Sequence, residues 1–144
     1  MGPTVVMLVD DEVPFVETMT KRLAVRDLTV LNAFSGPEAL EKLEKERHVD
    51  VIILDVKMPG MDGIETLREI KARYPLIEVI MLTGHGTIET AIEGMKLGAF
   101  DYLLKPTNID QLMTKVQEAR AKKRAHEDKI MQARLQEIAL RRGD

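Results

Sequence analysis

The 144-residue chain contains no cysteine. This absence excludes disulfide bonds, zinc–thiolate sites and catalysis by a thiol. No apolar run is long enough to span a bilayer, and no basic segment leads to a signal-peptide cleavage site near the start of the chain. We therefore expect no contact with membranes and a cytoplasmic location. The length suits one domain with a complete hydrophobic core.

Signatures of nucleotide and nucleic-acid binding are also missing. Neither a Walker loop nor a G-x-G-x-x-G motif appears, which argues against a flavin or nucleotide binder on an α/β sheet. No helix-turn-helix or aromatic platform follows the globular part, so we do not expect nucleic acid as a partner. Residues 1–119 carry 13 Lys/Arg against 20 Asp/Glu (net −7), whereas residues 120–144 carry 8 against 4 (net +4). Only the basic tail could make a weak contact with the phosphate backbone of a nucleic acid, or could serve as a contact surface for another partner.

Short apolar runs alternate with amphipathic segments along residues 1–119. The runs are rich in β-branched residues, as is typical of buried strands, and they span residues 4–9, 28–31, 51–54, 77–82 and 100–104. The intervening segments have apolar residues at helical spacing, as at Phe15, Met19 and Leu23. This alternation predicts an α/β fold: a doubly wound, five-stranded parallel sheet with strand order 2-1-3-4-5.

Residues 120–144 have a different pattern. They are charged and Ala-rich, with no proline. This composition predicts that the last helix of the domain continues as an extended C-terminal helix, with a frayed and solvated tail as the alternative. We therefore divide the chain into a domain over residues 1–119 and a helical extension over residues 120–144.

Polar residues stand at the ends of the predicted strands. Asp10-Asp11 ends the first strand, Asp55 the third, Thr83 the fourth and Lys105 the fifth. The carboxyl ends of parallel strands meet at one edge of a sheet, so these residues should cluster. Neighbouring carboxylates repel one another unless a cation intervenes, and Mg²⁺ is a natural counterion. A lone Asp in this setting suggests a nucleophile that forms an acyl phosphate, helped by the ammonium and the hydroxyl.

Each of these residues also has an ordinary structural explanation. The acid pair at Asp10 and Asp11 could cap the next helix, Thr83 could begin a turn, Lys105 could lie along a strand end, and Tyr102 could belong to the core. Their joint occurrence, in the right order along the predicted strands, favours the chemical interpretation.

Four segments together resemble the receiver domain of response regulators in two-component signalling. They read LVDDE at 8–12, LDVKMPGMDG at 54–63, TG at 83–84 and DYLLKP at 101–106. The resemblance covers residues 4 to about 119. The segments HG at 85–86 and GAFDY at 98–102 are most similar to receivers of the nitrogen-regulation type, and the resemblance implies the flavodoxin-like receiver fold of a bacterial signalling protein.

The resemblance implies that Asp55 accepts a phosphoryl group from a sensor histidine kinase or a phosphotransfer protein. Mg²⁺ would be bound directly by Asp11, by Asp55 and by the backbone carbonyl of Lys57, while Asp10 would act mainly through water. Lys57 departs from the Asn or small polar residue that is more frequent in the family. Because the implied ligand is its backbone carbonyl, metal binding should be preserved, although the ammonium would alter autodephosphorylation.

The resemblance also implies a switch. Lys105 and Thr83 would contact the phosphate, Thr83 would turn inward on phosphorylation, and Tyr102 would follow it. This movement would remodel the face formed by the fourth helix, the fifth strand and the fifth helix. A downstream protein, which the sequence does not identify, would recognise the new surface. The family usually holds Lys105-Pro106 in the cis form.

Other functions compete with this prediction. A phosphatase of the haloacid-dehalogenase type requires a second Asp two residues after the nucleophile, where Lys57 stands. We therefore expect a phosphorylated signalling protein rather than an enzyme, with self-phosphorylation and autodephosphorylation only. The alternative is a degenerate receiver, or a transcription-regulator fragment, acting as a protein-binding or dimerisation module. The sequence shows no output domain, and we expect a stand-alone receiver whose extension forms a homodimer or a partner contact.

Overall fold

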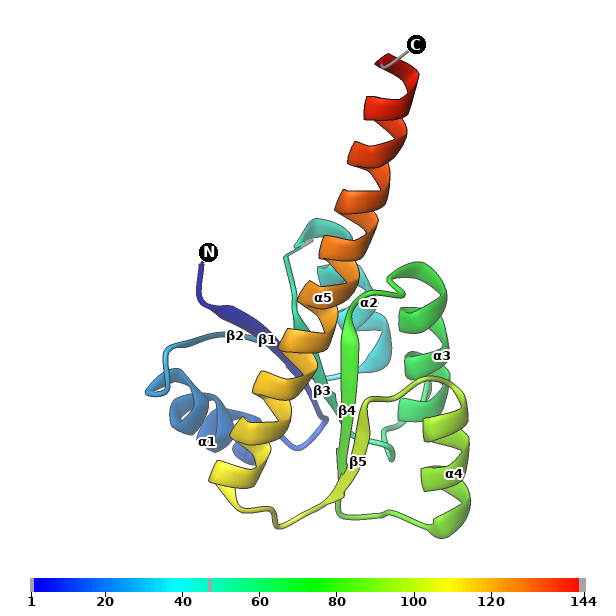
Figure 1. Ribbon diagram of the computed structural model, residues 1–144. Coiled ribbons are helices and arrows are strands. Elements are labelled where there is room, and N and C mark those ends of the chain that lie inside the picture. The colour runs from blue at the N-terminus through cyan, green and yellow to red at the C-terminus, as the bar shows by residue number, and fades with distance from the viewer. Residues whose placement is uncertain (1, 47, 143–144) are drawn as a thin grey trace.

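The computed structural model describes residues 2–46 and 48–142 (Figure 1). Within these residues the strands form one parallel sheet in the order β2-β1-β3-β4-β5, which confirms the predicted topology. The elements along the chain are β1 (Thr4–Val9), α1 (Val13–Ala24), β2 (Leu28–Ala33), α2 (Gly36–Lys45), β3 (Val51–Leu54), α3 (Gly63–Arg73), β4 (Glu78–Thr83), α4 (Ile88–Lys96), β5 (Asp101–Leu104) and α5 (Ile109–Arg142).

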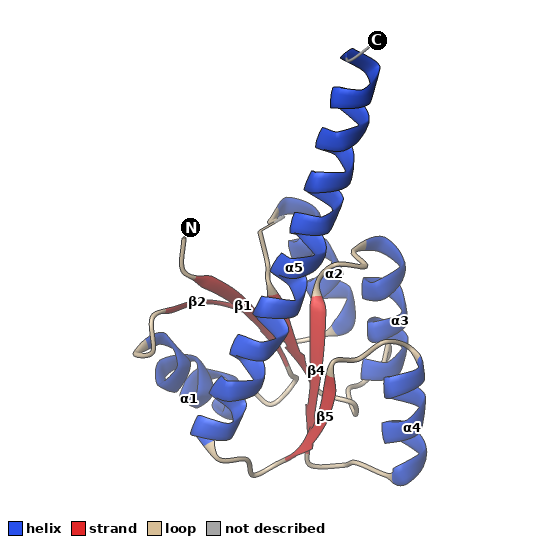
Figure 2. Cartoon of the chain, viewed as in Figure 1, coloured by secondary structure: helices blue, strands red, loops and turns tan. Residues whose placement is uncertain are grey.

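Two hydrophobic cores lie on opposite faces of the sheet, and the strand residues alternate between them. In β3, Ile52 and Leu54 face the core shared with α2 and α3, whereas Val51 and Ile53 face the core shared with α1 and α5. Figure 2 shows α1 and α5 on one side of the sheet and α2, α3 and α4 on the other. Burial on both faces explains why β3, in the middle of the sheet, is an unbroken apolar run.

The last helix confirms the predicted C-terminal extension. α5 is 34 residues long, and at its start the Oδ1 of Asn108 accepts a hydrogen bond from the amide of Asp110 at 2.7 Å. Its first half packs on the sheet through Leu112, Val116 and Ala119. The described residues from 125 onward are exposed, and this part projects from the domain (Figure 1). Among the described residues, no helix is both long and apolar enough to cross a membrane.

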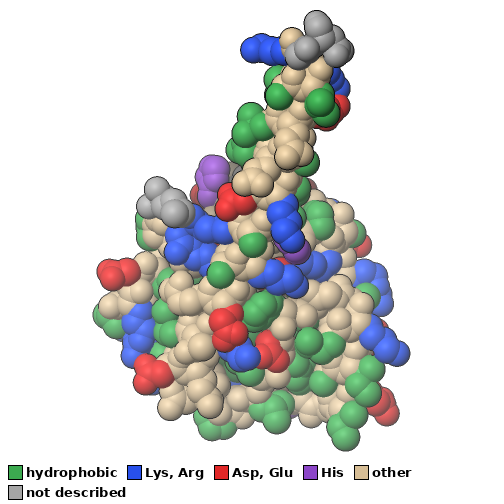
Figure 3. Space-filling model, in the orientation of Figure 1, with side chains coloured by type: hydrophobic (Ala, Val, Ile, Leu, Met, Phe, Trp, Pro, Cys, Tyr) green, Lys and Arg blue, Asp and Glu red, His purple; other side chains and the backbone are tan. Residues whose placement is uncertain are grey.

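Two lysines of α5 bind buried acids at the amino edge of the sheet. The Nζ of Lys123 lies 3.4 Å from Oδ1 of Asp50, just before β3, and both side chains are buried. The other oxygen of Asp50 accepts a hydrogen bond from the amide of Val5 at 2.9 Å. The Nζ of Lys122 lies 3.4 Å from Oε2 of Glu78, the first residue of β4. Part of the basic cluster around the base of the projecting helix (Figure 3) is therefore used inside the fold.

Candidate functional site

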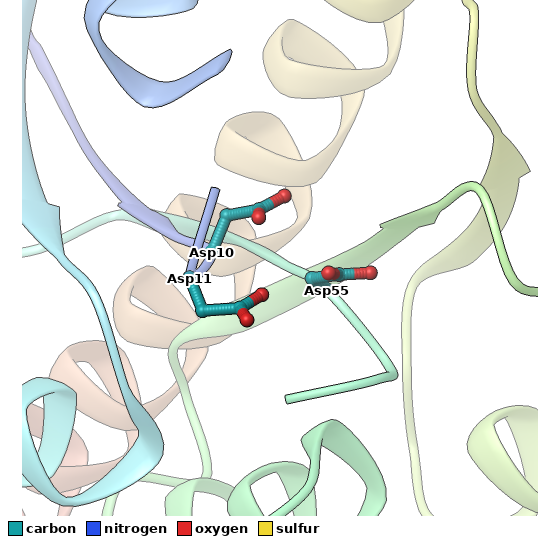
Figure 4. A group of neighbouring side chains, drawn as sticks. All are labelled: Asp10, Asp11 and Asp55. Atoms are coloured by element: carbon teal, nitrogen blue, oxygen red, sulfur yellow. The ribbon is translucent and has the colours of Figure 1, made fainter. Parts of the chain in front are cut away.

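The carboxyl edge of the sheet gathers the residues predicted from the strand ends. Asp10 and Asp11 follow β1, Asp55 follows β3, Thr83 ends β4 and Lys105 follows β5. β1 and β3 are paired neighbours, which places the residues that follow them side by side. The side chains of the three aspartates lie beside one another (Figure 4), and one carboxylate oxygen from each lies within 4.8 Å of the others.

Asp55 is buried and held firmly by its neighbours. Its side chain is 2% exposed, and its amide donates a hydrogen bond to the carbonyl of Val9 at 3.0 Å. Its Oδ1 accepts a hydrogen bond from the amide of Val56 at 2.8 Å. Gly63 begins α3 directly behind it, and a Cβ at this position would lie only 1.9 Å from the carbonyl oxygen of Asp55. Only glycine therefore permits this close approach of α3 to the strand end.

Both carboxylate oxygens of Asp10 have partners. Oδ1 accepts a hydrogen bond from the amide of Glu12 at 2.9 Å, and Oδ2 accepts one from the ammonium of Lys105 at 2.6 Å. Burial raises the pKa of Asp10 above its ordinary value of 3.8, and the charge of Asp55 adds to this effect, although the two hydrogen bonds oppose it. Burial, more than the neighbouring charge, therefore disfavours the ionised form of Asp10.

Lys105 supplies the positive charge of the site. Its amide donates a hydrogen bond to the carbonyl of Thr83 at 2.9 Å, which ties its backbone to β4. Its Nζ also lies 3.5 Å from Oε1 of Glu12 and 3.9 Å from the centre of the Phe15 ring. Burial alone would lower the pKa of Lys105, but the hydrogen bond to Asp10 and the surrounding carboxylates raise it above 10.5. The ammonium is therefore charged at neutral pH.

The two predicted switch residues have separate hydrogen-bond partners. Thr83 is fully buried, and its Oγ1 accepts a hydrogen bond from the amide of His85 at 3.0 Å. The hydroxyl of Tyr102 lies 2.7 Å from Oγ1 of Thr90, in the first turn of α4. Thr90 in turn forms a capping box with Thr87. Tyr102 is thus connected to the amino end of α4.

The acid cluster has the donor set and the access that a hard cation requires. A cavity of about 360 Å³ opens at this edge, and its lining includes Asp11 and Lys57. Asp11 is exposed, so its carboxylate is reachable from solvent. Mg²⁺ prefers one or two carboxylates together with water and phosphate oxygens. These residues fit such an ion, and the two engaged oxygens of Asp10 agree with a contact through water.

Three residues at this edge have no site role in the sequence prediction: Glu12, Phe15 and Thr90. Glu12 lies beside the acid pair and forms part of the same motif. The spacing of Thr87 and Thr90 resembles a capping signature and could have indicated the start of α4. The helical spacing of Phe15 with other apolar residues predicts only the inner face of a helix, because nothing in the local sequence connects Phe15 to Lys105.

A family model described as response regulator receiver domain matches residues 6–117. Transcriptional regulatory protein ZraR of Escherichia coli O157:H7 is 40% identical over 116 residues, which are 81% of this chain and 26% of that protein. DNA-binding transcriptional regulator NtrC of Escherichia coli K12 is 38% identical over 115 residues, which are 80% of this chain and 24% of that protein. The chain thus spans about a quarter of the length of these curated relatives.

Solved structures show the same likeness. A response regulator receiver domain protein from Clostridium thermocellum is 36% identical, with a TM-score of 0.81 over 85% of this chain and 98% of that one. The receiver domain of NtrX from Brucella abortus is 32% identical, with a TM-score of 0.75 over 81% of this chain and 98% of that one. Similarity to NtrC agrees with the predicted nitrogen-regulation type.

Proposed function

Because the chain belongs to the response regulator receiver family, we propose that Asp55 receives a phosphoryl group from the phosphohistidine of a sensor histidine kinase or a phosphotransfer protein. One observation carries this proposal: the buried Asp55 carboxylate lies beside two further acids, at the sheet edge where a fixed ammonium is also found. Receiver domains are signalling modules, and we propose that the only reactions of this one are its own phosphorylation and dephosphorylation.

In the proposed reaction, a carboxylate oxygen of Asp55 forms a bond to phosphorus while the P–N bond of the phosphohistidine breaks. The imidazole nitrogen keeps the electron pair of that bond and is then protonated from solvent. The amide of Val56 holds Oδ1, so we assign the attack to Oδ2. The protein otherwise has to position the reactants and neutralise charge on the transferring group, which are the tasks of Lys105 and Thr83.

Asp11, Asp55 and the backbone carbonyl of Lys57 are the proposed direct ligands of Mg²⁺, with Asp10 acting through water. When bound, the ion would neutralise negative charge on the acids and on the phosphoryl oxygens. Asp10 contributes in a second way, because its Oδ2 keeps the ammonium of Lys105 at the site. These roles account for every acidic residue of the cluster.

The proposed output is a change of the surface formed by α4, β5 and α5. To contact the phosphate, the hydroxyl of Thr83 would give up the hydrogen bond from His85, and Tyr102 would leave Thr90. A phosphate can shift such an equilibrium only if one state binds it better. This surface already exposes large apolar side chains suited to a protein partner: Ile88, Ile92, Met95 and Leu104. Figure 3 shows hydrophobic side chains at the surface of this part of the molecule.

We propose that residues 120–144 act as a helical extension of a receiver domain over residues 1–119, and that they contact a second copy or another protein. Exposed apolar residues at Met131, Leu135 and Ile138 share one side of this helix. Gly143 and Asp144, the end of the proposed extension, lie outside the described residues. Removal of residues 125–144, which keeps the ion pairs of Lys122 and Lys123, should dissociate the homodimer. A light-scattering mass that still corresponds to two subunits would contradict the proposed contact.

The test of the proposed function is intact mass after incubation with acetyl phosphate and Mg²⁺. The wild type should gain one phosphate that hydroxylamine removes, because hydroxylamine cleaves an acyl phosphate. Asp55→Ala should gain none. Asp62→Asn is a matched control, because it changes a nearby carboxylate that caps α3 and lies outside the cluster; it should be phosphorylated like the wild type.

Phosphate on Asp55→Ala would contradict the assignment of the acceptor. No phosphate on the wild type, after a slow donor and fast hydrolysis have been excluded, would contradict the proposed function. That result would instead favour a degenerate receiver used as a binding module.

A further inference from the structure

The ammonium of Lys105 is surrounded on several sides. Its Nζ is 2.6 Å from Asp10 Oδ2 and 3.5 Å from Glu12 Oε1, while the face of the Phe15 ring lies 3.9 Å away, measured to the ring centre. The Lys105 side chain is 14% exposed. Two carboxylates and one aromatic ring therefore define where this ammonium sits.

Phe15 reaches this position from the first turn of α1. The turn begins at Val13, and Pro14 follows in the N-terminal position where proline is tolerated. Val16, the next residue, is fully buried in the core between α1 and the sheet. Phe15 is only half-buried at the rim of that core, where its ring covers the lysine. A purely structural role would require apolar volume here, but it would not require a ring face under a cation.

We propose that Phe15 is a positioning residue for Lys105, and that its ring holds the ammonium next to the phosphoacceptor Asp55. The ring face attracts a cation because its π-electrons are negative relative to its edge. The stem of lysine has four flexible carbons, and the backbone amide of Lys105 is tied to the carbonyl of Thr83. The ring thus limits the freedom of the charged tip. This inference rests on the proposed function in assigning a phosphoacceptor.

A neutral ring serves this purpose in a way that another carboxylate would not. The carboxylates of Asp10 and Glu12 attract the ammonium but compete with an incoming phosphoryl group for it. The ring of Phe15 attracts the ammonium without a formal charge, so it does not add to the negative charge of the acid cluster. The ammonium can then turn from Asp10 toward a phosphate while it stays over the ring.

The experiment compares three variants. Phe15→Leu keeps an apolar side chain but removes the ring face, and Phe15→Tyr restores the ring. Phe100→Leu is the matched control, because Phe100 packs at the rim of the same core and precedes β5 at the opposite edge of the sheet. Two readouts are used: the NMR shifts of the Lys105 ε-methylene protons, which a ring face moves upfield, and the initial rate of phosphorylation by acetyl phosphate with Mg²⁺.

We expect upfield ε-methylene signals for Lys105 in the wild type, Phe15→Tyr and Phe100→Leu, and ordinary lysine shifts in Phe15→Leu. The phosphorylation rate should fall about 3- to 10-fold in Phe15→Leu, as expected for loss of one partly buried cation–π contact, and should be restored to within about 2-fold by Phe15→Tyr.

Ordinary Lys105 shifts in the wild type would overturn the inference. A rate for Phe15→Leu equal to that of the wild type would do so too, and so would a rate for Phe15→Tyr as low as that for Phe15→Leu, because restoring the ring would then not restore the rate. If the wild type itself takes up no phosphate, the proposed function fails, and the Lys105 shifts alone decide whether the ring positions the ammonium.

Discussion

Replacing Asp55 by Asn should stabilise the protein in metal-free solution while removing its capacity to accept phosphate. The change is almost isosteric, and Asn keeps the Oδ1 atom that accepts the hydrogen bond from Val56. What it removes is a negative charge on a side chain that is 2% exposed. That charge faces Asp10 and Asp11, whose nearest carboxylate oxygens lie within 4.8 Å. Relief of repulsion should therefore outweigh every other effect of the substitution.

The magnitude follows from Coulomb's law. At 4.8 Å and an effective dielectric constant of about 20, each like-charge pair costs about 3.5 kcal/mol. The attraction between Asp55 and Lys105 offsets roughly one of the two repulsions, that with Asp10. Solvent around the exposed Asp11 screens part of the second repulsion. A net gain of about 1–3 kcal/mol remains. With a urea dependence of about 2 kcal/mol/M, the midpoint of unfolding should rise by about 0.5–1.5 M.

The assay is urea unfolding of the wild type, Asp55→Asn and Asp62→Asn in EDTA, repeated with Mg²⁺. Asp62→Asn should stay close to the wild type, because Asn replaces Asp well as a helix cap. Saturating Mg²⁺ should stabilise the wild type by about 2.7 kcal/mol at 100 times its dissociation constant and should stabilise Asp55→Asn less. An unchanged or lower midpoint for Asp55→Asn in EDTA, or an equal gain with Mg²⁺ for both proteins, would refute the reasoning.

Three further predictions follow from the described contacts. Gly63→Ala should destabilise the protein by about 2–4 kcal/mol in urea unfolding, because its Cβ would overlap the carbonyl oxygen of Asp55; a loss below about 1 kcal/mol would contradict this. Lys123→Met should cost about 2–4 kcal/mol by leaving Asp50 buried without its cation, and adding Asp50→Asn should recover part of the loss. The pKa of Asp10 in the folded protein is raised above its ordinary value of 3.8. Protonated Asp10 therefore stabilises the fold fully below pH 3.8, and this stabilisation is lost as the pH rises through the higher pKa of the folded state. In EDTA, the urea midpoint of Asp10→Asn minus that of the wild type should therefore increase between about pH 4 and pH 7. A difference that does not change with pH would contradict the raised pKa of Asp10.

The sheet and its edge could be predicted because their signals are local. Each strand is one apolar run, and the residue at its end is next to it in sequence. Once the runs are ordered as a parallel sheet, the meeting of Asp10 and Asp55 follows from topology alone. The direct metal ligands and the roles of Thr83 and Tyr102 stay predictions, because they concern an ion and a phosphorylated state.

Contacts between distant residues could not be predicted in the same way. Phe15 repeats at helical spacing with other apolar residues, so the pattern predicts a core position for it. The pattern does not predict the contact of its ring with Lys105. Lys123 was one charge in a basic tail, and only the path of α5 across the sheet brings it to Asp50. In both cases the contact depends on where along the sheet a helix crosses the strands. A pattern of apolar residues does not determine that position to better than about one helical turn.

The path of α5 also has a mechanical consequence. The helix begins at the phosphoacceptor edge, passes the ion pair of Lys123 with Asp50 at the opposite edge, and continues into solvent. The first half of α5 is held along the sheet by Leu112, Val116 and Ala119, whereas its described residues from 125 onward are exposed. If the packed half tilts as one body, this ion pair is the point about which the helix turns. At 1.5 Å per residue, about 21 Å of helix precede Lys123 and about 29 Å follow it to Arg142. A sideways shift of the first turn would therefore reappear at the far tip in the opposite direction, enlarged by about 1.4-fold.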